Sequence, residues 1–251
     1  VLKAAQLTFE EGVAFPIFLG TKEKIEKIAL ENGIDILDMP VIDPKNDNTH
    51  DKRMQFGELF FAKRERKGYN SYEAKKIMKD RNYFGCMMVE TGEADAMISG
   101  LSKNYPDTIR PALQVIGKES NTEKVAGMYI MMTKKGPLFL ADTTVNFNPT
   151  AEELADIALL VAKEVRNFGI TPNIAFLSYS NFGSSNSAEA KLVARAREIV
   201  KQKEPTLVAD GEMQANVAFN KEILKDSYPF SELVDKDVNV LIFPNLESGN
   251  V

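Results

Sequence analysis

The segment 150–169, TAEELADIALLVAKEVRNFG, restricts the possible fold more than any other part of the sequence. Its apolar residues recur at intervals of three and four, which predicts an amphipathic helix with one buried face. Thr150 followed by Glu153 is a capping-box pattern, and Gly169 is a stop signal. Because β-rich runs stand on both sides, PLFLADTTVN before and IAFLSYS after, the segment indicates a sheet covered by helices.

Strand and helix patterns alternate along the chain, so we predict an α/β fold with mostly parallel sheets and helices on both faces. We expect two α/β lobes, 1–117 and 118–251, dividing near 117–121. The last helix of the first lobe, 107–118, is expected to open with Asp107 and to hold Pro111 in its first turn. Other helices are predicted at 21–33 and 71–82, a hairpin across KKG, and strands in VAFPIFLG, ILDMPVID, YFGCMMVE, DAMISG and VNVLIFP.

Composition excludes several classes of function. The 251 residues, 44% of them hydrophobic, suit a soluble α/β protein. A net charge of −5 offers no basic excess for nucleic acid. Apolar runs all fall short of the roughly 20 residues that span a bilayer. The sequence starts inside an amphipathic pattern and stops just after a predicted strand, so we expect the chain to be part of a longer polypeptide.

The single cysteine and the single histidine limit the chemistry further. Cys86 excludes an intramolecular disulfide, which fits a reducing cytoplasm, and its apolar surroundings indicate a buried thiol and not a nucleophile. His50 lies in DPKNDNTHDKR, for which we predict an exposed loop. A Ser-His-Asp triad and a histidine-ligated zinc site are therefore not expected.

The loop SYSNFGSSNS, after the strand IAFLSYS, is a candidate ligand site. Ligands of α/β sheets bind beyond the carboxyl ends of strands, where amides of the next helix face an anion. Gly183 permits close approach, and Ser180, Ser184 and Ser185 offer hydroxyl donors. We place the helix start at Asn186. The alternative is a loop that caps a helix and binds nothing; neither a Walker A pattern nor G-x-G-x-x-G occurs.

Three other stretches, TGEADAMISGLSKNYPDTIRP, DGEMQANVAFN and FPNLESGN, could face the same cleft as this loop, and a fourth stretch is basic. Arg110 could clamp a phosphate, or it could pair with Asp107 on a helix surface. The basic run KRERKG, 63–68, is either functional or a solvated helix end. The polar groups of DGEMQANVAFN and FPNLESGN follow no metal-binding spacing, so no metal site is predicted.

Taken together, GEADAMISG…DTIRPALQVI, LADTTVNFNPTAEELADIA, LSYSNFGSS…KLVARAREI, DGEMQANVAF and VLIFPNLESGN resemble, in this order, the phosphate acetyltransferase/phosphate butyryltransferase family. The resemblance implies an isocitrate/isopropylmalate dehydrogenase-like fold with a cleft between two lobes. It implies transfer of an acyl group between coenzyme A and phosphate, no redox cofactor, and a homo-oligomer, either a dimer or a larger assembly. The acyl-CoA- or phosphate-binding residues that it implies, together with candidates near them, are Arg64, Ser99, Gly100, Asp107, Arg110, Ser178, Ser180, Asn181, Gly183, Ser184, Glu247 and Asn250.

Two departures from the family pattern bear on catalysis. Active family members commonly carry His-Thr-Thr between S-G and D-x-x-R, whereas this chain has Lys103, Asn104 and Tyr105. A later Ser-Arg-Gly…Asp segment, which supplies catalytic groups in the family, would follow Val251. The resemblance therefore assigns no catalytic residue in this chain.

The sequence motifs SNFGSS, DGEMQANVAFN and FPNLESGN are similar to those of one branch of this family, the C-terminal domain of large bacterial NADP-dependent malic enzymes. This implies a cytoplasmic regulatory domain that binds acetyl-CoA and inhibits malate decarboxylation in the parent protein. NADP and a divalent metal would belong to the malic enzyme part. The alternatives are a working phosphate acyltransferase and a scaffold domain that has lost its ligand.

Overall fold

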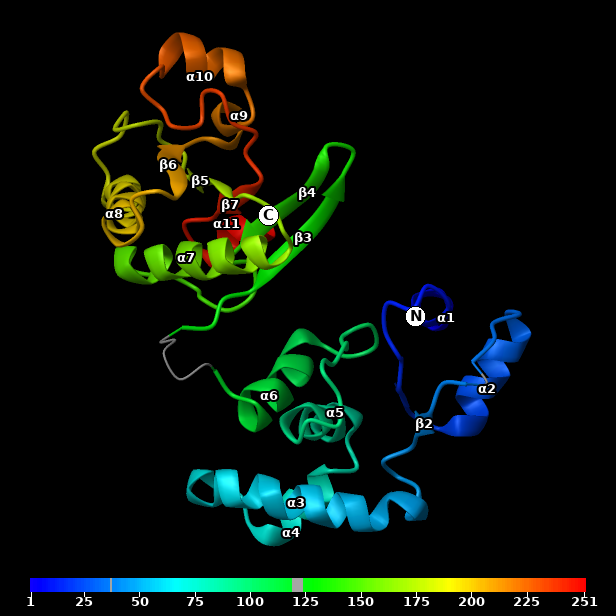
Figure 1. Ribbon diagram of the computed structural model, residues 1–251. Coiled ribbons are helices and arrows are strands. Elements are labelled where there is room, and N and C mark those ends of the chain that lie inside the picture. The colour runs from blue at the N-terminus through cyan, green and yellow to red at the C-terminus, as the bar shows by residue number, and fades with distance from the viewer. Residues whose placement is uncertain (37, 119–123) are drawn as a thin grey trace. The chain divides into compact units, whose positions relative to one another are not determined.

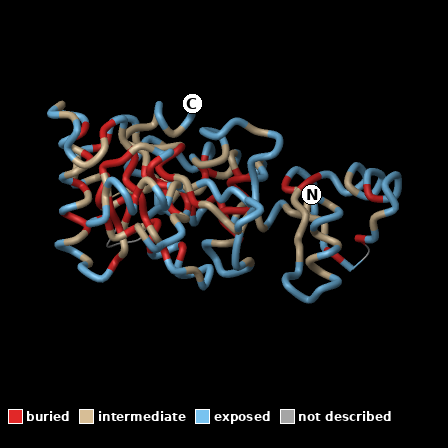
Figure 2. The backbone as a smooth tube through the Cα atoms, turned by 90° about the horizontal axis from the view of Figure 1, so that it is seen from above, coloured by how far each residue is buried: buried red, intermediate tan, exposed pale blue. Residues whose placement is uncertain are grey.

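The structure is a computed structural model that describes residues 1–36, 38–118 and 124–251 (Figure 1). It forms two compact units, Val1–Glu119 and Ser120–Val251. Each unit has hydrophobic clusters of its own, and Figure 2 shows where along the chain the buried residues lie. The predicted dividing segment 117–121 lies partly outside the described residues, so that boundary stays a prediction.

Unit 1 is mostly helical, which differs from the regular alternation expected of it. Its two short strands lie within VAFPIFLG and ILDMPVID, where strands were predicted, and they pair in parallel with Phe18 opposite Val41. Its elements are α1 (Leu2–Glu10), β1 (Phe18–Leu19), α2 (Lys22–Glu31), β2 (Val41–Ile42), α3 (His50–Arg64), α4 (Ser71–Ile77), α5 (Arg81–Glu90) and α6 (Tyr105–Val115), with 3-10 turns at Asp47–Thr49 and Glu65–Lys67.

Two predicted strands of unit 1 are wrong. YFGCMMVE forms helix α5, in which every residue from 82 to 88 is buried. A short run that is apolar on all sides has no helical periodicity to separate it from a buried strand. Asp80 fixes the helix start, because its Oδ1 accepts from Asn82 N at 2.8 Å and Tyr83 N at 3.4 Å. DAMISG contains no strand either.

Helix α6 begins earlier than predicted and carries Pro111 in its interior, not in its first turn. Proline has no N–H for the carbonyl four residues before it, which is that of Asp107. The Asn82 side chain supplies the missing donor, since its Nδ2 lies 3.2 Å from the Asp107 carbonyl oxygen. Helix α3 begins at His50, so it replaces the second part of the stretch DPKNDNTHDKR that was predicted as a loop. His50 itself is exposed, as predicted.

Cys86 is a buried core residue, as predicted, with 3% of its surface exposed. Its Sγ lies 3.7 Å from Met97 Sδ. Burial, together with the nearby charge of Asp80, raises the pKa of the Cys86 thiol to about 11.

The native protein is therefore expected to react very slowly with a water-soluble disulfide reagent at pH 8, because the thiol is enclosed and little thiolate forms. One thiol should become reactive on unfolding. A spectrophotometric thiol count in buffer and in denaturant checks this; fast reaction of the native protein would contradict the buried position.

Unit 2 contains a five-stranded sheet with the order β3-β4-β7-β5-β6. Strands β3 and β4 form the predicted antiparallel hairpin, and the other neighbours are parallel, which confirms a mostly parallel sheet. The elements are β3 (Met128–Thr133), β4 (Gly136–Ala141), α7 (Ala151–Asn167), β5 (Asn173–Leu177), α8 (Ala188–Lys203), β6 (Val208–Met213), α9 (Ala215–Ala218), α10 (Lys221–Ser227), β7 (Val240–Ile242) and α11 (Leu246–Asn250).

Helices cover both faces of this sheet (Figure 1). Ile174 and Phe176 of β5 pack with α7 and α8, whereas Ala175 and Leu177 pack with residues of α9 and α10. This alternation follows from the two-residue period of a strand. The capping box of α7 is confirmed, with Thr150 Oγ1 accepting from the Glu153 amide at 3.2 Å. None of the helices in the described ranges is long and apolar enough to cross a membrane.

The turn after β4 is organised by one buried carboxylate, that of Asp142, which is 3% exposed. Its oxygens accept from the backbone amides of Gly127, Thr144, Val145 and Asn146 at 2.8–3.1 Å, and also from the Asn146 side chain. Five donors on one buried carboxylate make this side chain the centre of the turn.

Strand β6 contains a bulge at Gly211. Ala175 of β5 lies opposite Asp210, whereas Leu177, only two residues further, lies opposite Met213. Gly211 takes a φ of +135°, and a Cβ on it would lie 2.6 Å from the Phe176 carbonyl oxygen. The bulge therefore requires glycine, and it determines where the next residue, Glu212, stands.

Candidate functional site

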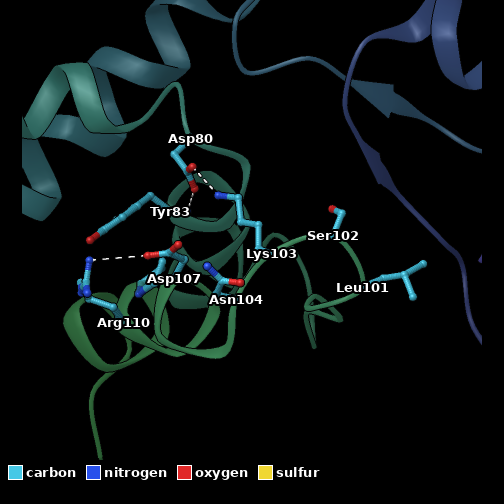
Figure 3. A pocket seen from close by; sticks show the side chains of 9 residues that line it. Asp80, Tyr83, Leu101, Ser102, Lys103, Asn104, Asp107 and Arg110 are labelled. Atoms are coloured by element: carbon cyan, nitrogen blue, oxygen red, sulfur yellow. Dashed lines mark hydrogen bonds and ion pairs between the residues drawn. The ribbon is translucent and has the colours of Figure 1, made fainter.

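A pocket of about 720 Å³ lies in unit 1, formed by the start of α5, residues 101–104 and the first turns of α6 (Figure 3). It brings together two of the predicted site residues, Asp107 and Arg110. The lining is Asp80, Tyr83, Leu101, Ser102, Lys103, Asn104, Asp107, Arg110 and Pro111.

Two cation–carboxylate pairs line this pocket. Lys103 Nζ donates to Asp80 Oδ2 at 2.6 Å, and the same carboxylate caps α5 through its other oxygen. Burial acts to raise the pKa of Asp80, but the hydrogen bonds from Lys103 and from the backbone N–H of Asn82 outweigh it and hold that pKa below its ordinary value. The second pair is looser, with Arg110 Nη1 3.8 Å from Asp107 Oδ1 and both side chains more than half exposed.

Side chains behind the pocket hold its walls in place. Ser99, one of the predicted site residues, donates through Oγ to Asn82 Oδ1 at 2.8 Å. It thereby supports the Asn82 side chain, which in turn donates to α6. The Tyr83 hydroxyl donates to Gln114 Oε1 at 2.6 Å, and burial raises the pKa of that hydroxyl.

Two other predicted residues of unit 1 do not line the pocket. Gly100 lies in the segment before it, with a φ of +119°. Arg64 is the last residue of α3, and the role of the basic run stays a prediction. Its Nε is buried and, among the described residues, has no hydrogen-bond partner.

In unit 2, the serine-rich loop after β5 is built around Glu212, which is 3% exposed. Ser180 Oγ and the Gly183 amide both donate to Glu212 Oε1, at 2.9 and 2.7 Å. Ser184 Oγ lies 3.1 Å from Ser180 Oγ. These hydroxyls hold the loop itself together, and Ser180 is only 1% exposed. Their role toward a ligand stays a prediction.

The rest of the loop is fixed by side-chain pairs. Asn181 Oδ1 accepts from the backbone N–H of Gln214 at 2.8 Å, and Asn181 Nδ2 donates to Gln214 Oε1 at 3.1 Å. Ser178 Oγ accepts from the Ser180 amide at 3.2 Å. The N-cap of α8 is Ser187, one residue after the predicted Asn186, because Ser187 Oγ reaches the third helical amide, of Ala190, at 3.1 Å.

The two remaining predicted residues lie on the short helix α11. Glu247 is exposed, whereas Asn250 Nδ2 donates to the Thr143 carbonyl at 3.0 Å and so joins α11 to the turn centred on Asp142. The predicted set thus divides into a group in unit 1 and a group in unit 2. Among the described residues, no group of three or more His, Cys, Asp or Glu side chains could hold a metal ion.

Sequence reasoning missed Asp80 and Lys103 as site residues, and it named Glu212 only as one polar group of DGEMQANVAFN. Asp80 had a usable signal, since an Asp followed by Arg-Asn before an apolar run is an N-cap pattern. Lys103 stood out only as a departure from His-Thr-Thr. Glu212 lies in a stretch that was expected to face the same cleft as the serine-rich loop, but its alternating pattern with Asp210 and Gln214 did not single it out as the residue that the loop is built around.

The whole chain, residues 1–251, matches the family described as phosphate acetyl/butaryl transferase. The chain belongs to this family. It is 37% identical to a phosphate acetyltransferase of Synechocystis, covering all of this chain and 36% of that protein. It is 35% identical to a Bacillus subtilis phosphate acetyltransferase, of which it covers 76%. It is also 35% identical to an NAD-dependent malic enzyme of Rhizobium meliloti, covering all of this chain and 33% of that protein.

Solved structures of two phosphotransacetylases agree with the fold. A phosphotransacetylase from Streptococcus pyogenes superimposes with a TM-score of 0.85 at 36% identity, covering 100% of this chain and 75% of that one. EutD phosphotransacetylase from Staphylococcus aureus gives a TM-score of 0.83 at 32% identity, covering 99% and 75%. The chain thus spans about a third of two of these relatives and three quarters of the others.

Proposed function

We propose that this chain binds acyl-CoA and phosphate and serves as the regulatory domain of a hybrid malic enzyme, with acetyl-CoA as its ligand. The single observation that carries the binding part is membership of the phosphate acetyl/butaryl transferase family across the full chain. The pocket with Lys103 and Arg110 supports it, because acyl phosphates and coenzyme A are anionic and arginine binds phosphate through two parallel hydrogen bonds.

The regulatory part rests on two observations. The Rhizobium malic enzyme contains a region that matches this whole chain, equal to 33% of its length. The chain also carries Lys103, Asn104 and Tyr105 where the family pattern has His-Thr-Thr. That departure favours binding over turnover. The nicotinamide nucleotide and the divalent metal would both bind outside this chain. The resemblance implies NADP as that nucleotide, whereas the Rhizobium relative is named for NAD.

The proposal includes finer features of fold and assembly. The two units would be the lobes of an isocitrate/isopropylmalate dehydrogenase-like fold, in a cytoplasmic homo-oligomer without a redox cofactor in this segment. Acetyl-CoA would lower malate turnover by favouring one state of the protein, with a coupling free energy of about 1–3 kcal/mol.

A working phosphate acetyltransferase is the second candidate, favoured by the Bacillus subtilis relative of that name. The two are separated with the full-length natural protein. Regulation predicts acetyl-CoA binding by calorimetry, lower malate turnover, and no acetyl phosphate formed from acetyl-CoA and phosphate. Acetyl phosphate at ordinary enzyme rates would establish the second candidate. Absence of acetyl-CoA binding would leave the scaffold alternative.

Arg110→Ala is expected to weaken acetyl-CoA or phosphate binding about tenfold or more, because it removes charge-assisted hydrogen bonds. Its loose pair with Asp107 contributes little to stability, so the melting temperature should hardly change. Calorimetry measures the Kd. Arg195→Ala is the matched control, since Arg195 makes a similar exposed pair with Glu198 on α8. Equal Kd values for both variants would remove Arg110 from the site.

A further inference from the structure

The position of Lys103 is defined by the fold, unlike that of Arg110. Asp80 is fixed as the cap of α5, and Lys103 Nζ lies 2.6 Å from its Oδ2. Only 28% of the Lys103 side chain is exposed, compared with 58% for Arg110. In the described part of the chain, Lys103 therefore gives the pocket its ordered cation (Figure 3).

An ammonium group held in this way still has donors to offer. Of its three N–H bonds, one points to Asp80, and a lysine that lines a pocket can direct the others at a ligand. Arg110, Ser102 and Asn104 line the same pocket and add a guanidinium fork, a hydroxyl and a side-chain amide. Such a set suits an anion with more than two acceptor oxygens, since a carboxylate would be satisfied by the arginine fork alone.

We propose that Lys103 is a specificity-determining residue that binds a phosphate group in this pocket, and that Asp80 is the positioning residue that orients Lys103. This rests on the proposed function and extends it to a residue for which the comparisons supply no role. Asp80 acts through Lys103 and not on the ligand, because its two oxygens are occupied by the α5 amides and by the ammonium group.

The test measures binding of inorganic phosphate and of acetyl-CoA to the full-length protein. Lys103→Met is expected to weaken phosphate binding about tenfold or more. Lys103→Arg should recover part of that loss, because the charge and the donors remain. Lys203→Met is the matched control, since Lys203 Nζ also lies 2.6 Å from a carboxylate, that of Asp156, outside the pocket.

Asp80→Asn separates positioning from helix capping. Asparagine caps helices as well as aspartate, so the melting temperature should stay near that of the natural protein. Phosphate binding should weaken, but less than in Lys103→Met, because the ammonium group keeps its charge and loses its fixed position. Tighter phosphate binding would show that Asp80 competes with the ligand, and it would overturn the positioning role.

The outcomes distinguish this inference from the proposed function. If acetyl-CoA and phosphate bind and Arg110→Ala weakens them while Lys103→Met does not, the role of Lys103 is overturned and the proposed function stands. Lowered melting temperature in Lys103→Met with unchanged phosphate affinity would mean a purely structural ion pair. A natural protein that binds neither ligand would remove the proposed function itself.

Discussion

Asp142→Ala is expected to lower the free energy of unfolding by about 3–5 kcal/mol, because each buried donor left without an acceptor costs about 1–3 kcal/mol. Four backbone amides and one side-chain amide would lose their shared acceptor in a site that is 3% exposed. Relaxation and entering water would satisfy some of these donors, so the loss stays below the full sum.

Urea unfolding followed by circular dichroism measures this change. Asp156→Ala is a control, since that carboxylate forms a pair on the surface with Lys203 and should change stability by about 1 kcal/mol at most. Asp142→Asn should fall between them, because one oxygen remains while the new NH2 faces other donors. If Asp142→Ala unfolds with the same free energy as the natural protein, water replaces the carboxylate completely.

Gly211→Ala is the second large effect, an expected loss of about 3–5 kcal/mol from backbone strain and a steric clash together. The φ of +135° is unfavourable for any residue with a Cβ, and the new atom would lie 2.6 Å from the Phe176 carbonyl oxygen. Moving β6 away from β5 to relieve this contact would also move Glu212, which holds the serine-rich loop.

Gly136→Ala separates the two causes. Its φ is +115°, and a Cβ there would have no neighbour within 4 Å. It should cost only the strain, about 1–3 kcal/mol. Unfolding curves of the two variants give the clash as their difference. Equal losses would mean that β6 adjusts around the added methyl group without cost.

The sequence predicted unit 2 well because its signals were local and unambiguous. The capping box at Thr150 and the KKG turn each specify one conformation, and both are present in the structure. Unit 1 was predicted less well. Its core helix α5 is buried on all sides, so its apolar run resembled a strand. Pro111 was predicted in a first turn, where no backbone donor is lost. In the structure it lies inside the helix, and the donor that it lacks is replaced by the side-chain amide of Asn82, a distant residue in the chain.

The candidate sites show the same division. Arg110 was identified as an arginine near a predicted strand end and through the family resemblance, and both Arg110 and Asp107 line the pocket. The Lys103–Asp80 pair joins residues 23 positions apart, and the Ser180–Glu212 pair joins residues 32 apart. Such pairings depend on which elements become neighbours, and a single sequence contains no local sign of that.

The bond from Asn82 to the Asp107 carbonyl has a consequence for how the pocket can change shape. It fastens α5 to α6 at the point where Pro111 interrupts the helical ladder. Sliding one helix along the other would leave that carbonyl without a donor, at a cost of about 1–3 kcal/mol. The backbone of the wall that carries Arg110 is therefore held in one register, and adjustment to an arriving molecule is left to exposed side chains such as that of Arg110.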